Sequence, residues 1–235
     1  MFAQMNRKDF NMSNSAAINN MLSKLYNQYT SDFLSEYRCA FHDDNAPSRI
    51  NEFGIIDETR FDTNHRILIV AKETNGWRNE EFDEGILFRT WMEEISLSGL
   101  QGHDHIRKYP TMWYNIGRWI TLIQYPETDL TTLSKEKRNA LTAIGTAAFT
   151  NINKVRGNNK SGKAYKQMSY SDIAGTVLRE EIEIIQPKVV LCCGTYSPFH
   201  YHMPNYNGKV FIMPHPAARK SSSEMLNDLL QQIIK

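Results

Sequence analysis

The sequence predicts an α/β fold in which helices cover both faces of a parallel, four-stranded sheet. Four short runs are almost continuously apolar, at residues 66–71, 147–151, 188–193 and 209–213. A continuously apolar strand is typical of a parallel sheet that is covered on both faces. Between the runs, apolar residues recur at spacings of three and four, which is typical of helices. Strands that alternate with helices in this way indicate a three-layer α/β/α sandwich.

The helices of this sandwich each carry one apolar stripe. They are expected at residues 84–97, 112–123, 172–186 and 224–235. Pro187 ends the third of them, because proline lacks the N–H that a helix needs. In residues 1–63, the apolar positions between Ile18 and Tyr37 predict a helical extension packed on the core. The α/β domain itself is expected to span residues 64–235.

The composition excludes several classes of protein. Lys and Arg number 27 against 26 Asp and Glu, so the formal net charge of +1 is unlike that of a histone-like polyanion binder. Hydrophobic residues make up 41% of the chain, which is too many for a disordered protein. No run approaches the roughly 18 apolar residues that cross a bilayer, and the first residues lack the apolar segment of a secretory signal. We therefore expect a cytoplasmic protein with no membrane contact. The sequence leaves its oligomeric state open, with a monomer favoured.

The first two loops at the carboxyl ends of the strands carry polar groups suited to a site. Ligands of open α/β sheets bind at this edge. After the first strand, Glu73 and Asn75 are suited either to holding a water molecule or to a helix-capping turn. Asn151 ends the second strand, and its carboxamide offers the donor and acceptor needed to read the edge of a base. The basic segment that follows predicts phosphate contacts or a solvated surface loop; its charged residues are Lys154, Arg156, Lys160, Lys163 and Lys166.

The last two loops contain histidines, which differ in how well they suit a functional site. His200 and His202 follow the third strand, but no third ligand has a spacing that would complete a metal site with them. We therefore expect no metal. His215 lies between two prolines after the fourth strand, so its ring is held on stiff backbone. Arg219 and Lys220 follow, and both attract phosphate oxygens.

Residues 64–235 resemble the uracil-DNA glycosylase superfamily, whose members share a parallel four-stranded α/β/α sandwich. The segment His-Pro-Ala-Ala-Arg at 215–219 is similar to the second signature loop of that superfamily. The segment Thr-Asn-Ile-Asn-Lys-Val-Arg at 150–156 resembles the Thr-Asn-x-x-Lys-x-Arg segment of the branch that carries an iron–sulfur cluster. The first signature, Gly-x-x-Pro-Gly, is absent at 71–76, and so are the cysteines of the cluster. The resemblance therefore implies a divergent member without a cofactor.

This resemblance implies hydrolysis of the N-glycosidic bond of a damaged base that is flipped out of DNA. In that mechanism His215 stabilises the departing base, and Glu73 or Asn75 positions the attacking water. Asn151 binds the base edge, and Phe88 stacks on the base, unless Phe88 serves only to pack its helix. Arg219 enters the gap in the DNA, and the expected DNA contacts together are Lys154, Arg156, Lys160, Lys163, Arg219 and Lys220.

Two other functions are compatible with the same residues. The first is a catalytically inactive module of the same fold that binds a base, a nucleotide or nucleic acid; the altered first signature favours it. The second is an unrelated α/β protein that binds a nucleotide or cofactor and has no affinity for DNA. The dependence of binding on salt separates the second from the others, since contacts to phosphates release counterions.

Overall fold

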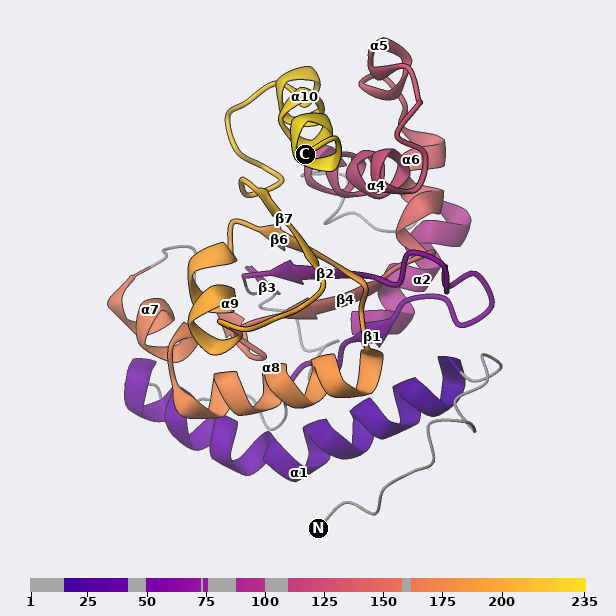
Figure 1. Ribbon diagram of the computed structural model, residues 1–235. Coiled ribbons are helices and arrows are strands. Elements are labelled where there is room, and N and C mark those ends of the chain that lie inside the picture. Colours follow the sequence, from indigo (N-terminus) through magenta and orange to yellow (C-terminus); the bar gives the residue numbers. More distant parts are fainter. Residues whose placement is uncertain (1–14, 42–49, 73, 76–87, 100–109, 158–161) are drawn as a thin grey trace.

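The computed structural model describes residues 15–41, 50–72, 74–75, 88–99, 110–157 and 162–235 (Figure 1). The main sheet has five strands in the order β1-β4-β2-β6-β7. Their bounds are β1 Gly54–Ile55, β2 Ile67–Ala71, β4 Ala148–Asn151, β6 Val189–Cys193 and β7 Lys209–Met213. The pairs β4–β2, β2–β6 and β6–β7 are parallel, whereas β1 runs antiparallel to β4. The predicted α/β fold is confirmed, but the sheet is mixed and has five strands rather than four.

The burial of the strands follows their place in the sheet. All five side chains of the central strand β2 are buried, as expected for a strand covered on both faces. Strand β7 lies at the edge, and Ile212 there is 47% exposed. The side chain of Gln232 accepts a bond of 2.7 Å from the Ile212 N–H and donates one of 3.0 Å to its carbonyl. The outer backbone of the edge strand is thereby satisfied at this position, which discourages pairing with another chain.

Helices lie on both sides of the sheet (Figure 1). On one side are α1 (Ser15–Phe41) and α8 (Asp172–Ile185), which pack against each other. On the other side are α4 (Pro110–Gln124), α6 (Arg138–Ile144) and α10 (Ser222–Ile233). Helix α2 (Phe88–Ser98) packs on α6. The smaller elements are α5 Leu130–Leu133, α7 Lys163–Ser169, α9 Tyr196–His202 and a two-stranded sheet of β3 Thr74–Asn75 and β5 Arg156–Gly157.

The helix α4 adds to the core through its aromatic and aliphatic side chains. Trp119 and Ile120 of this helix are fully buried in the core. Gly117 allows α4 and α6 to approach closely, because a Cβ at this position would lie 1.7 Å from the carbonyl oxygen of Ala140. The buried side chains of α4 are therefore part of the core.

The long helix α1 is tied to the domain by buried and half-buried polar contacts. The carboxamide of Asn19 accepts from the Ile55 N–H at 2.9 Å and donates to the Ile55 carbonyl at 3.1 Å. The hydroxyl of Tyr29 donates to Glu180 of α8 at 2.6 Å. The buried apolar residues of α1 belong to the same core as those of the sheet. None of the described helices is both long and apolar enough to cross a bilayer.

Candidate functional site

The carboxyl ends of β2 and β6 form the crevice where an α/β sheet of this order binds ligands. The chain leaves β2 toward β4 on one side and leaves β6 toward β7 on the other, so the strand order reverses between β2 and β6. The two strand ends are joined by a hydrogen bond of 2.6 Å from the Thr195 hydroxyl to the Val70 carbonyl. Lys72 and Gly194, the first residues after β2 and β6, lie at this crevice.

A cavity of about 440 Å³ opens between this crevice and the helices α7 and α9. Its volume lies within the range of small-molecule pockets. The cavity carries three lysines, two tyrosines and no carboxylate among its described lining residues. Those residues are Lys72, Gly162, Lys163, Tyr165, Lys166, Tyr170, Gly194 and Pro198. The lining therefore favours an anion that also has an apolar or aromatic part.

The ammonium group of Lys72 lies over an aromatic ring in this cavity. Its Nζ is 4.5 Å from the centre of the Tyr165 ring. Lys72 is half-buried and Tyr165 is buried, so the charge is placed at the base of α7 rather than in open solvent. A cation held over a ring face is attracted by the negative face of the ring.

Gly194 brings the loop after β7 to the same place. Its φ of +74° favours glycine, and a Cβ there would lie 3.2 Å from the backbone nitrogen of His215. The Gly194 N–H donates to the Met213 carbonyl at 2.8 Å. The close approach of the two loops places the backbone of His215 directly behind a residue that lines the cavity.

The imidazole of His215 is held in one tautomer. Its Nδ1 accepts a hydrogen bond of 3.2 Å from the Ala217 N–H, so in the neutral ring the proton is on Nε2. Burial, together with repulsion from the charge of Lys72, lowers the pKa of His215 below its usual 6.5. At pH 7 His215 is therefore a neutral side chain with an Nε2–H that donates.

Asn151 lies on the other side of the crevice. It ends β4 opposite Ala71 of β2 and is 2% exposed. Two backbone bonds, from Ile152 N–H to the Ala71 carbonyl and from Asn153 N–H to the Lys72 carbonyl, hold the following turn against the end of β2. Strands β4 and β7 are separated by three strand spacings, or about 14 Å. The described lining of the cavity includes neither Asn151 nor His215, so a hollow shared by these two side chains is still a prediction.

The expected phosphate contact of Lys154 is wrong. Lys154 is 0% exposed, and its Nζ donates to the Glu181 carboxylate at 2.7 Å. It also donates to the Thr150 hydroxyl and to the Asn151 carbonyl, both at 2.5 Å. Burial lowers the pKa of Lys154, and the charge of Glu181 opposes this shift. The ammonium group is enclosed within the protein and cannot reach the phosphate of a bound nucleic acid.

The expected stacking of Phe88 on a base is also wrong, and the alternative of core packing holds. Phe88 is 4% exposed at the start of α2. Its ring centre lies 5.0 Å from that of Phe53, 5.1 Å from that of Phe149 and 5.6 Å from that of Trp91. These neighbouring rings enclose Phe88 and leave no space for a base.

The other expected site residues differ in where they lie: some are exposed, and others are outside the described side chains. Lys163 is exposed and lines the cavity. Arg219 and Lys220 are exposed after β7, and Lys220 pairs with Asp228 of α10. Asn75 pairs with Gly157 in the small sheet and Arg156 pairs with Thr74, but these side chains are outside the described part, as are Glu73 and Lys160.

The histidines and cysteines near the third loop have structural positions. The Nε2 of His202 lies 2.9 Å from the Ser169 carbonyl, whereas His200 is exposed and stacks on Tyr196. Burial raises the pKa of Cys192 to about 12, so this thiol is protonated. Within the described residues, no group of three or more His, Cys, Asp or Glu side chains is placed to hold a metal ion.

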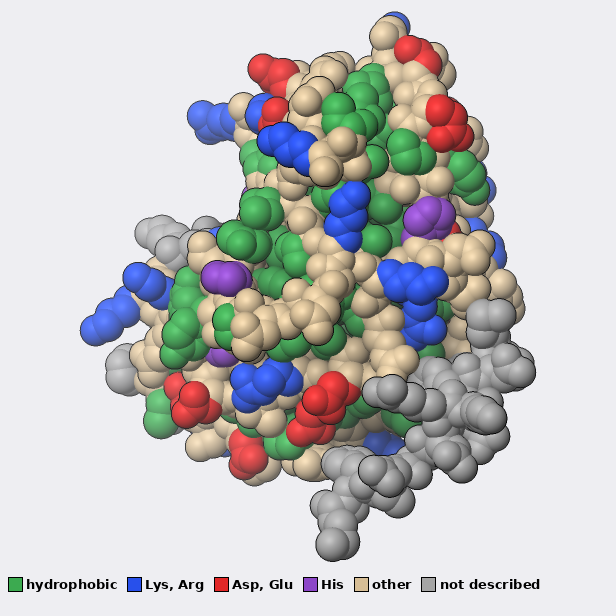
Figure 2. Space-filling model, in the orientation of Figure 1, with side chains coloured by type: hydrophobic (Ala, Val, Ile, Leu, Met, Phe, Trp, Pro, Cys, Tyr) green, Lys and Arg blue, Asp and Glu red, His purple; other side chains and the backbone are tan. Residues whose placement is uncertain are grey.

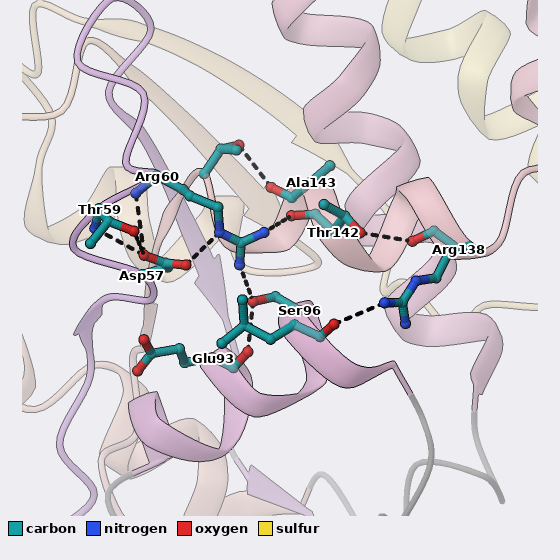
Figure 3. Close-up of polar contacts among 10 residues, drawn as sticks. Asp57, Thr59, Arg60, Glu93, Ser96, Arg138, Thr142 and Ala143 are labelled. Atoms are coloured by element: carbon teal, nitrogen blue, oxygen red, sulfur yellow. Dashed lines mark hydrogen bonds and ion pairs between the residues drawn. The ribbon is translucent and has the colours of Figure 1, made fainter.

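A second polar cluster lies at the opposite, amino-terminal end of the strands (Figure 3). Arg60 forms an ion pair with Asp57, donates to the Ser96 hydroxyl at 2.5 Å and approaches the Thr142 carbonyl at 3.4 Å. Arg138 of α6 donates to the Leu97 carbonyl at 2.8 Å. These bonds join the segment before β2 to α2 and α6, which indicates a structural clamp rather than a ligand site.

Sequence reasoning missed three residues of the cavity, Lys72, Tyr165 and Tyr170. The signal for them was present, since two tyrosines alternate with the lysines of the basic segment 154–170. That pattern of aromatic and basic residues is typical of surfaces that bind single-stranded nucleic acid.

Comparison with protein families and with curated proteins adds no relative. No protein family model matches the chain, and no curated protein matches it at a significant level.

Proposed function

We propose that this protein is a DNA glycosylase of the uracil-DNA glycosylase type, which hydrolyses the N-glycosidic bond of a damaged base flipped out of DNA. The single observation that carries the proposal is the donor geometry of His215. Its Nε2–H belongs to a neutral imidazole on a stiff Pro-His-Pro turn beside a lysine-lined cavity. On this proposal the parallel strands β4, β2, β6 and β7 are the sheet of that family, and β1 is an addition.

The proposed role of His215 follows from where charge develops. Breaking the bond leaves negative charge on the base, mostly on a carbonyl oxygen, and a fixed N–H donor stabilises it. The nearby charge of Lys72, which lowers the pKa of His215 together with burial, also favours the anion. Donors of this kind act without reorganising when the reaction occurs.

The remaining roles come from the resemblance. Asn151 would read the edge of the base, and Glu73 or Asn75 would position the water that attacks the sugar. Arg219 would fill the gap in the DNA, and Lys163 and Lys220 would contact phosphates. The partner is therefore DNA, and the extrusion of one nucleotide from the stack is part of the proposed reaction.

The test is excision from a panel of oligonucleotides that carry uracil, hypoxanthine or mismatches, followed by alkaline strand scission. The wild-type chain should cut at least one of them. His215→Ala should lower the excision rate about a hundredfold or more, because one preorganised donor is lost. The matched control is His65→Ala, whose histidine lies at the amino-terminal end of β2 and pairs with Asp62. Excision by His215→Ala at the wild-type rate would remove this residue from the mechanism.

A second function, binding without catalysis, is favoured by the first loop. The segment 71–76 lacks the proline and first glycine of the family signature, and this is the loop that handles water. A binding module would retain a base-containing oligonucleotide and leave every glycosidic bond in the panel intact. Retention without any excision would therefore replace the first proposal with this one.

A further inference from the structure

The cavity between α7 and the ends of β2 and β6 gathers positive charge around one hollow. Lys163 and Lys166 are exposed and three residues apart on α7, so they lie on neighbouring positions of one helix face. Lys72 enters the same hollow from the end of β2. Like charges at this spacing repel each other, and an anion that contacts several of them relieves the repulsion. A phosphate group is the anion of suitable size and charge in a nucleic acid.

The two tyrosines of the lining differ in what they offer a ligand. Tyr165 is buried, and its ring already contacts Lys72. Tyr170 is half-exposed, and its ring meets Tyr201 in an edge contact with centres 5.2 Å apart. The ring of Tyr170 is thus oriented by a neighbour and borders the hollow. A nucleobase stacks well on such a ring, and only an unpaired base has a face free to do so.

The face drawn in Figure 2 shows no long basic surface. On the face drawn in Figure 2, basic side chains alternate with acidic and apolar ones and form no continuous band. A duplex presents phosphates along two strands, so it is best bound by a long basic surface. A hollow of about 440 Å³ with a few lysines and an aromatic ring suits a single nucleotide.

We infer that this cavity binds an unpaired nucleotide of single-stranded DNA, with the phosphate on Lys72, Lys163 and Lys166 and the base on Tyr170. The inference rests on the proposed function and narrows it, because the damaged base would then be extruded from the stacked bases of a single strand rather than from a duplex. Gly194 connects the two sites, since it lines the cavity and lies against the backbone of His215. The nucleotide in the cavity is therefore a neighbour of the one that His215 acts on.

The first test measures binding of the full chain to a fluorescent single-stranded oligothymidylate by anisotropy. The competitors are the matching duplex, thymidine monophosphate, thymidine and inorganic phosphate. The single strand should bind at least tenfold more tightly than the duplex, and thymidine monophosphate should compete better than thymidine or inorganic phosphate. Tighter binding of the duplex, or equal competition by phosphate alone, would overturn the inference. So would a free mononucleotide that binds more tightly than the strand.

The second test uses variants of two exposed lysines and of the half-exposed Tyr170, and circular dichroism checks that each variant is folded. Replacing both helix lysines, Lys163→Ala with Lys166→Ala, should weaken binding tenfold or more and reduce the slope of log K against log salt by about 0.7 per lysine. Tyr170→Ala should cost about tenfold, and Tyr170→Trp should restore binding. The matched control is Lys135→Ala with Lys137→Ala, two exposed lysines outside the cavity. Unchanged binding in the first double variant would rule out the assignment.

The two proposals fail in different ways. His215→Ala should still bind the single strand while it loses excision. If the wild-type chain excises a base but Lys163→Ala with Lys166→Ala keeps full single-strand affinity, the cavity assignment and the phosphate contact of Lys163 fail, whereas the proposed excision by His215 stands. If single-strand binding depends on these lysines and no base is excised, the glycosylase proposal fails and the cavity assignment stands.

Discussion

Two lysines of one basic segment, Lys154 and Lys163, have opposite environments. Lys154 is completely enclosed, and its ammonium group contacts the Glu181 carboxylate, the Thr150 hydroxyl and the Asn151 carbonyl. Lys163 is exposed at the rim of a cavity that has no carboxylate in its described lining. The first lysine holds β4 against α8 within the fold, and the second is available to a ligand. Local sequence charge therefore says little about which role a lysine has, and a carboxylate from a distant helix decides it.

The enclosed lysine organises the end of β4. Its bond to the Asn151 carbonyl and its ion pair with Glu181 of α8 connect this strand end to the helix layer. Tyr26 of α1 completes the group, because its hydroxyl donates to Glu181. Burial, followed by the charge of Glu181, raises the pKa of Tyr26, so its phenol is neutral. The position of Asn151 thus depends on the helices α1 and α8 besides its own strand and the turn that carries Lys154.

The largest effect is expected where this buried pair is broken. Glu181→Gln leaves the Lys154 charge enclosed without a carboxylate, and we expect the free energy of unfolding to fall by about 3–5 kcal/mol. Urea denaturation followed by circular dichroism measures it. A loss below about 1 kcal/mol would contradict the description of Lys154 as an enclosed charge.

Two further variants sharpen this result. Glu183→Gln changes an exposed carboxylate of the same helix and should shift stability by no more than about 0.5 kcal/mol. Lys154→Met combined with Glu181→Leu removes both charges and should recover most of the stability lost in Glu181→Gln, since neither ion is then desolvated.

An intermediate effect is expected at Lys72. This lysine is half-buried, whereas Lys154 is fully enclosed and Lys163 is exposed. Burial and the Lys72 charge both lower the pKa of His215, so Lys72→Met should raise that pKa toward 6.5. The titration of the His215 Cε1–H signal by NMR measures the change. Lys188→Met, at the amino-terminal end of the sheet, is the matched control and should leave the titration of His215 unchanged. A fall in the His215 pKa in Lys72→Met would show that the two groups do not repel each other.

The smallest effect is expected for the stability of the cavity variants. Lys163→Ala and Lys166→Ala remove exposed side chains, so each should change the free energy of unfolding by no more than about 0.5 kcal/mol. The same urea titration measures it. A loss like that of Glu181→Gln would mean that these lysines support the fold, and the contrast with Lys154 would disappear.

The four long strands could be predicted because each is a short apolar run that ends in a turn. The structure places strands at Ile67–Ala71, Ala148–Asn151, Val189–Cys193 and Lys209–Met213, each within the expected run. The strand β1 could not be predicted, since two residues form no periodic pattern. It is defined by pairing with β4, a contact between distant parts of the chain.

The candidate site was less predictable than the fold. The Pro-His-Pro turn marked His215 directly, because the stiffness of that backbone is local. The burial of Lys154 depends on its ion pair with Glu181. The burial of Phe88 depends on packing against Phe53 and Phe149, and all these partners are distant in sequence. The cavity exists only once α7 packs beside the ends of β2 and β6, so no single segment shows it.

The bond between Tyr26 and Glu181 has a consequence for the order in which the molecule assembles. It joins residues 155 positions apart, so α1 can form this contact only after α8 has been synthesised. Until α8 emerges, the side of α1 that packs against α8 has no partner there. The docking of α1 on α8 is therefore a late step in the assembly of a chain that folds during synthesis.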